Sequence, residues 1–296
     1  MTIPVILGVA TLVFSLIHLV PGDPAQSMLG EAAAQGDVAE LRTRLGLDRP
    51  LLTQYVDYMT RALHGDLGTS FRYGTPVTKE IAARLGKTAQ LALAAMAVAI
   101  LIAVPLGTVA AVFKGRTIDQ AAMTASLIGV SLPNFWLGPV LAMIFAVGLG
   151  WLPVSGAGTP AHLVLPAVTL GAALAAVLAR LTRASVIEEL QELYVVAARA
   201  RGLSKWRAIV RHALRNSLVP VVTLIGLQFG AVQTGTIITE TIFAWPGLGR
   251  LLIQAISFRD YPLVQACILF LAVTYVAMNL FVDLAYGWLD PRIRVK

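Results

Sequence analysis

Six long apolar runs, separated by more polar segments, follow one another along the chain. None of them alternates between apolar and polar residues, as the strands of a transmembrane β-barrel do. Each is long enough to cross a bilayer, whose hydrocarbon core needs about 20 helical residues, and a backbone in lipid must close its hydrogen bonds within its own helix. The pattern therefore predicts six transmembrane helices, at residues 3–20, 88–113, 123–149, 163–181, 218–239 and 263–287.

The first run also fits the apolar part of a secretory signal peptide. No small-residue cleavage site follows it, and "PGDPA" at residues 21–25 is typical of a turn. We therefore interpret residues 1–20 as the first transmembrane helix.

Residues 21–87 form a long polar insertion between the first two runs. Apolar residues recur in it at helical spacing over residues 38–45 and 52–63, with Gly46 and Pro50 between them. This predicts two short amphipathic helices, followed by the glycine-rich stretch "HGDLGTSFRYGTP". A segment of this size has only a small core of its own, so we expect it to pack on the membrane part or on a partner.

Composition supports a membrane protein, and charge adds an orientation. The chain is 57% hydrophobic and 13% charged, with a mean hydropathy of +0.76, which is far more apolar than a soluble domain. Residues 21–87 carry eight Lys or Arg and eight Asp or Glu, whereas residues 180–217 carry eight basic and three acidic residues. Residues 240–262, the loop after the fifth run, carry two basic and two acidic residues. The remaining basic positions lie on the same side as residues 180–217: Lys114, Arg116, Arg292, Arg294 and Lys296.

Short loops rich in Lys and Arg stay in the cytoplasm. We therefore predict an external insertion at 21–87, a transmembrane core at 88–287 with a cytoplasmic loop at 182–217, and a cytoplasmic tail at 288–296, so that both termini are inside. The net charge of +7 then follows from topology. Nucleic acid is not an expected partner, because no basic patch is interleaved with exposed aromatic residues.

Candidate chemistry is sparse. "GKT" at residues 86–88 is similar to the end of a phosphate-binding loop, but Ile81 stands where that loop requires glycine. Cys267 is the only cysteine, which leaves it no partner for a disulfide or a metal site. We predict no catalytic residue, no metal site and no cofactor bound by this chain.

Ion-coupled transport is disfavoured. His18 is interpreted as a polar side chain bonded to a neighbouring helix, and Asp283 as paired or reaching toward the membrane face. No acidic residues pair across the spans, and the last three spans do not evidently repeat the first three. The energy for any transport would have to come from a partner.

The loop at 182–217 has the pattern of a helix, a sharp turn and a second helix. Positions of one face of the first helix are Leu190, Leu193, Tyr194, Ala197 and Ala198. Gly202 ends this helix as a left-handed C-terminal residue does, and Ser204 can cap the next. In the second helix we expect Trp206, Ile209, Val210 and Ala213 on one face and Arg207, Arg211 and Arg215 on another.

This loop has two interpretations. A cationic amphipathic helix can lie on lipid headgroups. The Ala-Ala pair followed by glycine, however, packs closely against protein and offers little to lipid, which favours a docking element.

These residues resemble the cytoplasmic EAA loop of binding-protein-dependent ABC importer permeases. Ala197, Ala198, Gly202 and Pro220 fall on its pattern of Ala-Ala, three residues, Gly and a downstream Pro, while Val196 stands in place of the Glu that names the loop. Further motifs resemble the first-subunit permease of dipeptide, oligopeptide and glutathione importers: "LVPGDPA" (19–25), "LGLDRPLLTQY" (45–55), "GDLGTS" (65–70), "LPAVTLG" (165–171), "ARLTRAS" (179–185), "FAWPGLGRLL" (243–252) and "RDYPLVQA" (259–266).

The resemblance implies an all-α, six-helix type I ABC importer permease (MetI-like) fold in the bacterial inner membrane. It implies three kinds of partner: a second homologous permease, two ATPase subunits that bind ATP and Mg, and an external solute-binding protein. The chain would be a non-catalytic transport subunit for short peptides or peptide-like solutes, with glutathione, nickel chelates and opines as alternative cargoes. A passive channel and an ion-coupled carrier are the rival classes.

Three groups of site residues follow from the resemblance and from the residue types. The ATPase-docking loop would use Tyr194, Ala197, Ala198, Arg199, Gly202, Ser204, Arg207 and Arg211. Polar residues in or near the spans that could line the pathway, or equally well bond between helices, are Asn134, Gln228, Gln233 and Thr234. Contact with the binding protein is expected at Trp245, Gly247 and Arg250, in a short helix near the path.

Overall fold

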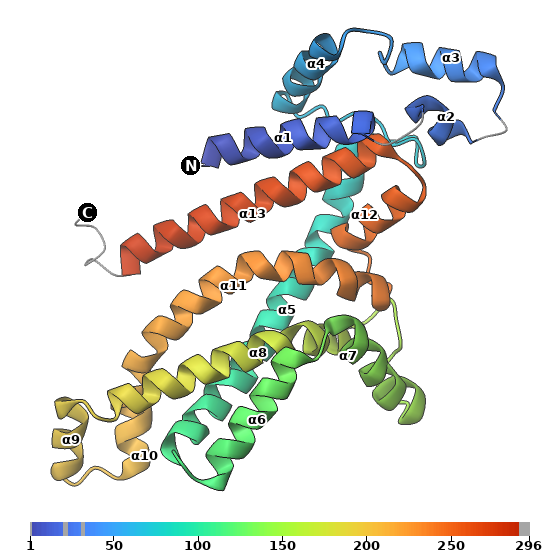
Figure 1. The fold of residues 1–296 in the computed structure, drawn as a ribbon. Coiled ribbons are helices and arrows are strands. Elements are labelled where there is room, and N and C mark those ends of the chain that lie inside the picture. The colour runs from blue at the N-terminus through green and yellow to red at the C-terminus, as the bar shows by residue number, and fades with distance from the viewer. Residues whose placement is uncertain (1, 20–22, 31–32, 290–296) are drawn as a thin grey trace. The chain divides into compact units, whose positions relative to one another are not determined.

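The computed structural model describes residues 2–19, 23–30 and 33–289, which form helices joined by turns (Figure 1). The only β-type pairing within these ranges is an isolated bridge between Thr69 and Pro76. The chain divides into two compact units, residues 1–87 with 246–280 and residues 88–245 with 281–296. The all-α fold predicted from the apolar runs is confirmed.

The first unit holds four N-terminal helices, a short helix after residue 246, and parts of two long helices. The short ones are α1 (Thr2–Leu19), α2 (Pro24–Leu29), α3 (Gln35–Arg44), α4 (Leu51–Leu63) and α12 (Leu248–Ser257). The long ones are α5 (Val77–Val112) and α13 (Tyr261–Leu289). Helices α3 and α4 are the two predicted in the insertion, and Gly46 and Pro50 separate them as expected.

Helix α2 was not predicted, because its sequence was interpreted as a turn. The Asp23 carboxylate accepts the backbone N–H of Ala25 at 3.1 Å, and Pro24 occupies the first helical position. An aspartate cap followed by proline is a helix start as well as a turn signal. The six residues that follow are enough for one short helix.

Helices α1 and α4 are joined by polar and aromatic contacts. The Thr11 and Tyr55 hydroxyls lie 2.7 Å apart, and His18 Nε2 lies 3.2 Å from Gln54 Oε1. The Phe14 ring centroid is 5.3 Å from that of Tyr55 and 5.7 Å from that of Tyr58, within the usual range for aromatic pairs. The interpretation of His18 as bonded to a neighbouring helix is confirmed.

The loop before α5 is tied to the start of α13. The Ser70 hydroxyl donates to Asp260 Oδ2 at 2.5 Å, and the backbone N–H of Arg72 donates to the same oxygen at 3.1 Å. Asp260 Oδ1 accepts the N–H of Leu263, which caps the first turn of α13. Both Ser70 and Asp260 are buried, so two motifs far apart in the sequence meet in one buried contact.

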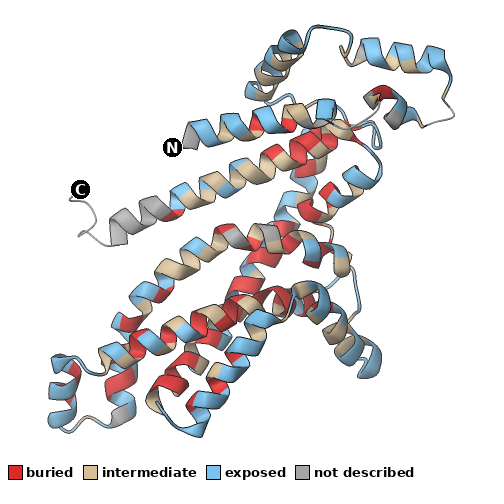
Figure 2. Cartoon of the chain, viewed as in Figure 1, coloured by how far each residue is buried: buried red, intermediate tan, exposed pale blue. Residues whose placement is uncertain are grey.

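The second unit is built around α8 (Ala161–Glu189), which packs against α6 (Thr117–Ser131), α7 (Asn134–Leu141) and α11 (Leu214–Ile242). In Figure 2 buried residues run along α8 and the neighbouring part of α5. Alanine is frequent in this core, together with leucine, valine and Trp245. Small side chains let helix backbones approach closely, which is typical of helices that pack within a membrane.

Two glycines show how close α5 and α8 come. A Cβ atom on Gly107 would lie 2.5 Å from the carbonyl oxygen of Ala179, and one on Gly171 would lie 2.7 Å from that of Ala95. No real Cβ contact is that short, so any larger residue at either position would push the two helices apart.

The third predicted span is wrong as a single helix. Residues 123–149 are divided between α6 and α7, the latter continuing as the π-helical segment η1 (Ala142–Gly148), and the two parts are bent by 106°. Leu132 has φ −84° and ψ 116° and is followed by Pro133. A residue before proline is driven out of the helical region, so this dipeptide breaks the helix although the apolar composition continues.

Among the described residues, four helices are long and apolar enough to cross a membrane, or five if the bent pair counts as one span. Helix α1 corresponds to the first predicted span, but within it Pro4–Ser15 counts only as a shorter apolar helix. The other predicted spans correspond to α5, α8, α11 and α13; the last three helices extend beyond the predicted spans at both ends, and α5 ends at Val112, one residue before its predicted end. In particular α5 begins at Val77, eleven residues before the predicted start at 88, so part of the predicted insertion belongs to a long helix. Asp283 and the whole predicted tail at 288–296 lie outside the residues whose side chains are described.

Candidate functional site

The loop predicted at 182–217 connects α8 to α11 within the second unit (Figure 1). It contains α9 (Leu193–Ala200), α10 (Lys205–Ala208) and the π-helical turn η2 (Ile209–Ala213), which runs directly into α11. The predicted helix, turn and helix are confirmed. We call residues 189–217 the α9–α10 segment.

Gly202 makes the turn between the two helices. Its φ is +91°, and the N–H groups of Gly202 and Leu203 donate to the carbonyls of Arg199 and Ala198 at 3.0 and 3.3 Å. These two bonds form a Schellman motif, which closes a helix with a left-handed residue, usually glycine. Ser204 follows, and its carbonyl accepts the N–H of Ala208 at 3.0 Å at the start of α10.

Small apolar residues pack the two helices together. Val195 of α9 is buried against Ala208 and Ala213, with Leu190 partly buried beside them. Ala198 is 1% exposed, whereas its neighbour Ala197 is exposed. The Ala-Ala pair is therefore divided: Ala198 belongs to the interior of the segment and Ala197 to its surface.

The predicted faces need two corrections. In α9 the buried residues are Val195 and Ala198, and Leu193 is exposed. In the second helix Ala208, Ile209 and Ala213 are buried, while Trp206 and Val210 are exposed. The π turn η2 begins at Ile209, so from that residue on the helix departs from the spacing of 3.6 residues per turn on which the prediction relied.

The outer surface of the α9–α10 segment combines apolar and cationic side chains. Leu193 is 83% exposed, and Val196, Trp206 and Val210 are each at least half exposed. The predicted docking residues Arg199, Ser204, Arg207 and Arg211 are exposed as well. Large apolar side chains on a helical surface indicate a contact with protein or membrane.

Tyr194 connects three parts of the segment. Its hydroxyl donates to the Glu189 carboxylate at the end of α8 and accepts from Asn216 Nδ2 at 2.9 Å at the start of α11. Burial and, after it, the hydrogen bond with Glu189 raise the pKa of Tyr194 above its ordinary value, so the hydroxyl stays a donor at neutral pH. Glu189 and Asn216 were missed by the sequence reasoning, although each lies in a polar stretch that flanks an apolar helix.

A buried ion pair stands close to this segment along α8. Arg183 donates Nε and Nη2 to the two oxygens of Asp119 at 2.5 and 2.7 Å, and the N–H of Gly115 donates to Asp119 at 2.9 Å. Asp119 is 3% exposed. The pair joins the first turn of α6 to the last part of α8, and the sequence reasoning did not find Asp119.

Two family models match the chain. "Binding-protein-dependent transport system inner membrane component" matches residues 103–295, and the model of the N-terminal part of such membrane components matches residues 1–92. The chain belongs to this family. It is an ABC importer inner-membrane permease, as the motif resemblance predicted, and its several apolar helices agree with a multi-pass inner-membrane protein.

Similar proteins carry the name "Glutathione transport system permease protein GsiC". The one of Salmonella typhimurium is 46% identical over 294 residues, covering 99% of this chain and 96% of its own. That of Pectobacterium atrosepticum has the same identity and coverage. That of Escherichia coli K12 is 44% identical over the same length and coverage.

A solved structure described as an amino acid ABC transporter with histidines is similar in fold. It matches with a TM-score of 0.52 at 16% sequence identity, over 70% of this permease and 92% of that chain. The likeness agrees with the expected type I importer fold.

The residues expected to line the pathway of the permease lie on α7 and α11, which pack together. Asn134 begins α7, and its Nδ2 lies 3.8 Å from the position that a Cβ on Gly235 would occupy. Gln228 Nε2 and Gln233 Oε1 are buried and have no hydrogen-bond partner among the described residues. The side chain of Thr234 lies outside the described residues.

The residues expected to touch a binding protein are not a surface group. The Trp245 side chain is 1% exposed and packs in the core of the second unit with residues of α5, α8 and α11. Gly247, which precedes α12, is buried, and Arg250 is half-buried. The prediction for Trp245 is therefore corrected: its indole stabilises the permease core.

Glu240 is a second buried acid that the sequence reasoning missed. It was assigned to a loop beginning at 240, but α11 continues to Ile242, and Glu240 is 0% exposed. It accepts a hydrogen bond of 2.7 Å from the Thr88 hydroxyl of α5. Its position directly after an apolar run was the available signal.

Proposed function

We propose that this chain is the transmembrane permease subunit of an ATP-driven importer for short peptides or peptide-like solutes. The observation that carries the proposal is the 44–46% identity, over 99% of the chain, to permeases named for glutathione transport. Glutathione is therefore the first cargo to test, followed by dipeptides, tripeptides, nickel chelates and opines.

The α9–α10 segment is proposed as the ATPase-docking element. Its exposed apolar residues are available for a partner, and its buried alanines and the Schellman turn hold the two helices in a fixed relation. A partner that pushes on α9 would thereby displace the ends of α8 and α11 together. We call this rigid connection the lever. A transporter that changes between two states, each favoured by ligands on one face of the membrane, needs such a connection between its ATPase and its transmembrane helices. ATP and Mg belong to the ATPase subunits in this proposal.

The translocation pathway is proposed to form between this permease and a second homologous one. Gln228 and Gln233 support this assignment, because a buried polar atom without a partner is costly unless another group satisfies it. The proposed topology places residues 21–87 outside and the α9–α10 segment and both termini inside. The external solute-binding protein would then meet the 21–87 insertion.

Reconstitution tests the proposal. The permease, its second permease and the ATPases are placed in proteoliposomes with ATP inside and a binding protein outside. ATP hydrolysis should rise when the loaded binding protein is added, and labelled glutathione should accumulate. Solute flux that needs no ATP would support a passive channel, and flux that follows an ion gradient would support a carrier; either result overturns the proposal.

A further inference from the structure

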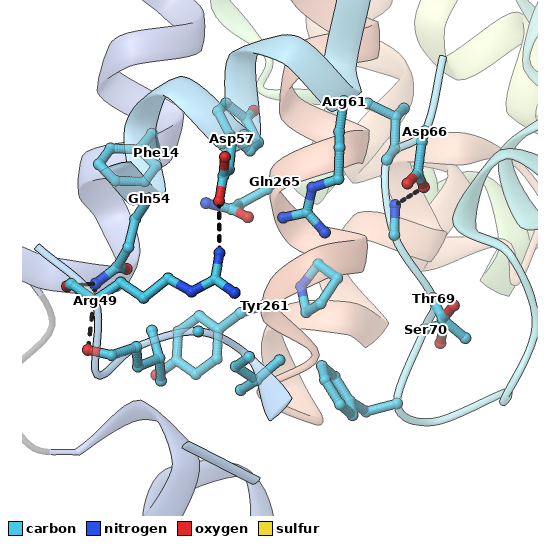
Figure 3. Close-up of a pocket in the computed structure, with 18 of the residues that line it drawn as sticks. Phe14, Arg49, Gln54, Asp57, Arg61, Asp66, Thr69, Ser70, Tyr261 and Gln265 are labelled. Carbon is cyan, nitrogen blue, oxygen red and sulfur yellow. Dashed lines mark hydrogen bonds and ion pairs between the residues drawn. The ribbon is translucent and has the colours of Figure 1, made fainter. Parts of the chain in front are cut away.

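A cavity of about 810 Å³ lies within the first unit (Figure 3). Its walls come from the end of α1, the turn between α3 and α4, one side of α4, the 66–74 loop and the first turns of α13. Cavities that hold small molecules commonly measure about 300–1,000 Å³. This cavity belongs to neither the α9–α10 segment nor the polar residues of α11.

The charges of the lining cancel. Arg49, Arg61, Asp57 and Asp66 are its Arg and Asp residues, and it contains no Lys or Glu. Arg49 Nη1 donates to Asp57 Oδ2 at 3.0 Å, which leaves the second Asp57 oxygen outside that contact. Among the described residues Asp66 accepts one bond, from the N–H of Gly68 at 3.0 Å.

Arg61 is the cation of the cavity without a partner. Its side chain forms no ion pair or hydrogen bond with any residue that the structure describes. Figure 3 shows it extending from the last turn of α4 into the cavity, in the space between Arg49 and Asp66. A guanidinium in this position offers its planar set of donors to a carboxylate.

Tyr58 adds an unused polar group. Tyr58 is one of the lining residues, its hydroxyl oxygen is buried, and within the described part of the chain nothing bonds to that oxygen. Burial raises the pKa of Tyr58 to about 12, so the group remains a neutral donor at physiological pH. A buried hydroxyl left without a partner is costly, and a ligand amide would satisfy it.

We propose that this cavity binds a short zwitterionic peptide, with the ligand carboxylate on Arg61, its ammonium group at Asp57 or Asp66, and an amide at Tyr58. The balanced lining favours a zwitterion over a polyanion, because two carboxylates would repel a polyphosphate. That the ligand is a zwitterion is inferred from the charges of the cavity alone. That this zwitterion is a peptide rests on the proposed function.

Binding to the full-length chain in nanodiscs of neutral lipid tests the site, without ATPase or binding protein. Isothermal titration compares trialanine, its C-terminal amide, its N-acetyl form and pyrophosphate. Trialanine should bind about tenfold more tightly than the amide, since a hydrogen bond to a charged group contributes about that factor or more. The N-acetyl form should also be weaker, and pyrophosphate should bind least.

Arg61→Gln should lower trialanine affinity to that of the amide and leave the amide unchanged. Lys79→Gln is the matched control, because Lys79 is exposed on the adjacent helix α5, lies outside the lining and carries the same charge. An unchanged thermal transition would show that Arg61→Gln folds. Equal binding of acid and amide by the parent, retained discrimination by Arg61→Gln, or tighter pyrophosphate binding overturns the site.

The remaining outcomes separate this site from its rivals. If Arg61→Gln weakens capture of the loaded binding protein while trialanine binding is unchanged, Arg61 serves a protein contact and the inference is wrong. If trialanine binding depends on Arg61 but the reconstituted parent takes up no peptide, the site stands and the proposed peptide importer fails.

Discussion

Arg183 of α8 holds the buried carboxylate of Asp119 at the start of α6 through two parallel hydrogen bonds of 2.5 and 2.7 Å. The bidentate geometry fixes the direction of both side chains. Because Arg183 lies within two turns of the end of α8, movement of the α9–α10 segment would reach α6 through this pair. The pair therefore belongs to the proposed lever although it lies outside the docking surface.

Removing Arg183 alone should lower the free energy of unfolding more than removing the charges of both Arg183 and Asp119. Arg183→Ala leaves a buried carboxylate uncompensated, which in buried pairs costs about 3–5 kcal/mol; the partial exposure of Arg183 puts the expected loss near the lower end. The double variant Asp119→Asn with Arg183→Ala should unfold at a higher temperature than Arg183→Ala alone. Thermal unfolding in detergent measures the order, and a double variant less stable than the single one would contradict it.

The cost of replacing Gly202 is set by backbone strain. Gly202 has φ +91°, but a Cβ there would meet no atom within 4 Å. Ala and Leu should therefore destabilise the α9–α10 segment alike, by about 1–2 kcal/mol, because the cost comes from the left-handed backbone. Asn should cost less, since it enters that region more readily. Local protease resistance measures the segment, and a Leu variant far worse than Ala would point to an unseen steric contact.

Sequence patterns were sufficient for most of the helices and their order, because apolar runs and the glycine and proline breaks between them are local signals. The 106° bend at Leu132 and Pro133 was missed, because composition continues across it while backbone sterics do not. The start of α5 at Val77 was missed because its first turns are polar.

The sequence predicted the helix, turn and helix of the candidate site, but not which of its side chains are exposed. Helical spacing placed Trp206 and Val210 on one face with Ile209 and Ala213, whereas the structure exposes the first two and buries the other two. A single extra residue per turn leaves no mark in the periodicity of so short a helix. The bonds of Asp119 and Glu240 could not be predicted from local patterns either, because their partners Arg183 and Thr88 lie 64 and 152 residues away in the sequence.

Thiol labelling on intact cells tests the proposed topology. Leu63 is 85% exposed in the insertion and Leu193 is 83% exposed in the α9–α10 segment, so cysteines at the two positions should be equally reactive once reached. Leu63→Cys should react with an impermeant maleimide, and Leu193→Cys should react only after the cells are opened. The native Cys267 is buried and serves as the background control. The reverse pattern would invert the topology.

Two tyrosines on α4 should respond oppositely to loss of the hydroxyl. Tyr58→Phe removes a buried hydroxyl without a described partner, so the thermal transition of the unliganded chain should be unchanged or higher. Tyr55→Phe removes the 2.7 Å bond to Thr11 and should cost about 0.5–1.5 kcal/mol. A destabilised Tyr58→Phe would mean that its hydroxyl has a partner outside the described residues.

Substitutions at the adjacent residues Ala197 and Ala198 should distinguish an effect on ATPase docking from an effect on folding. Ala197 is exposed and Ala198 is buried within the α9–α10 segment. Ala197→Trp should leave the thermal transition of the permease unchanged and abolish co-purification with the ATPase, because added volume on a close interface keeps the partner away. Ala198→Trp should lower the transition itself, since the side chain has no room beside Val195 and Ala208. Normal ATPase binding by a stable Ala197→Trp protein would remove α9 from the docking surface and leave the exposed residues of α10 and η2 as its remaining candidates.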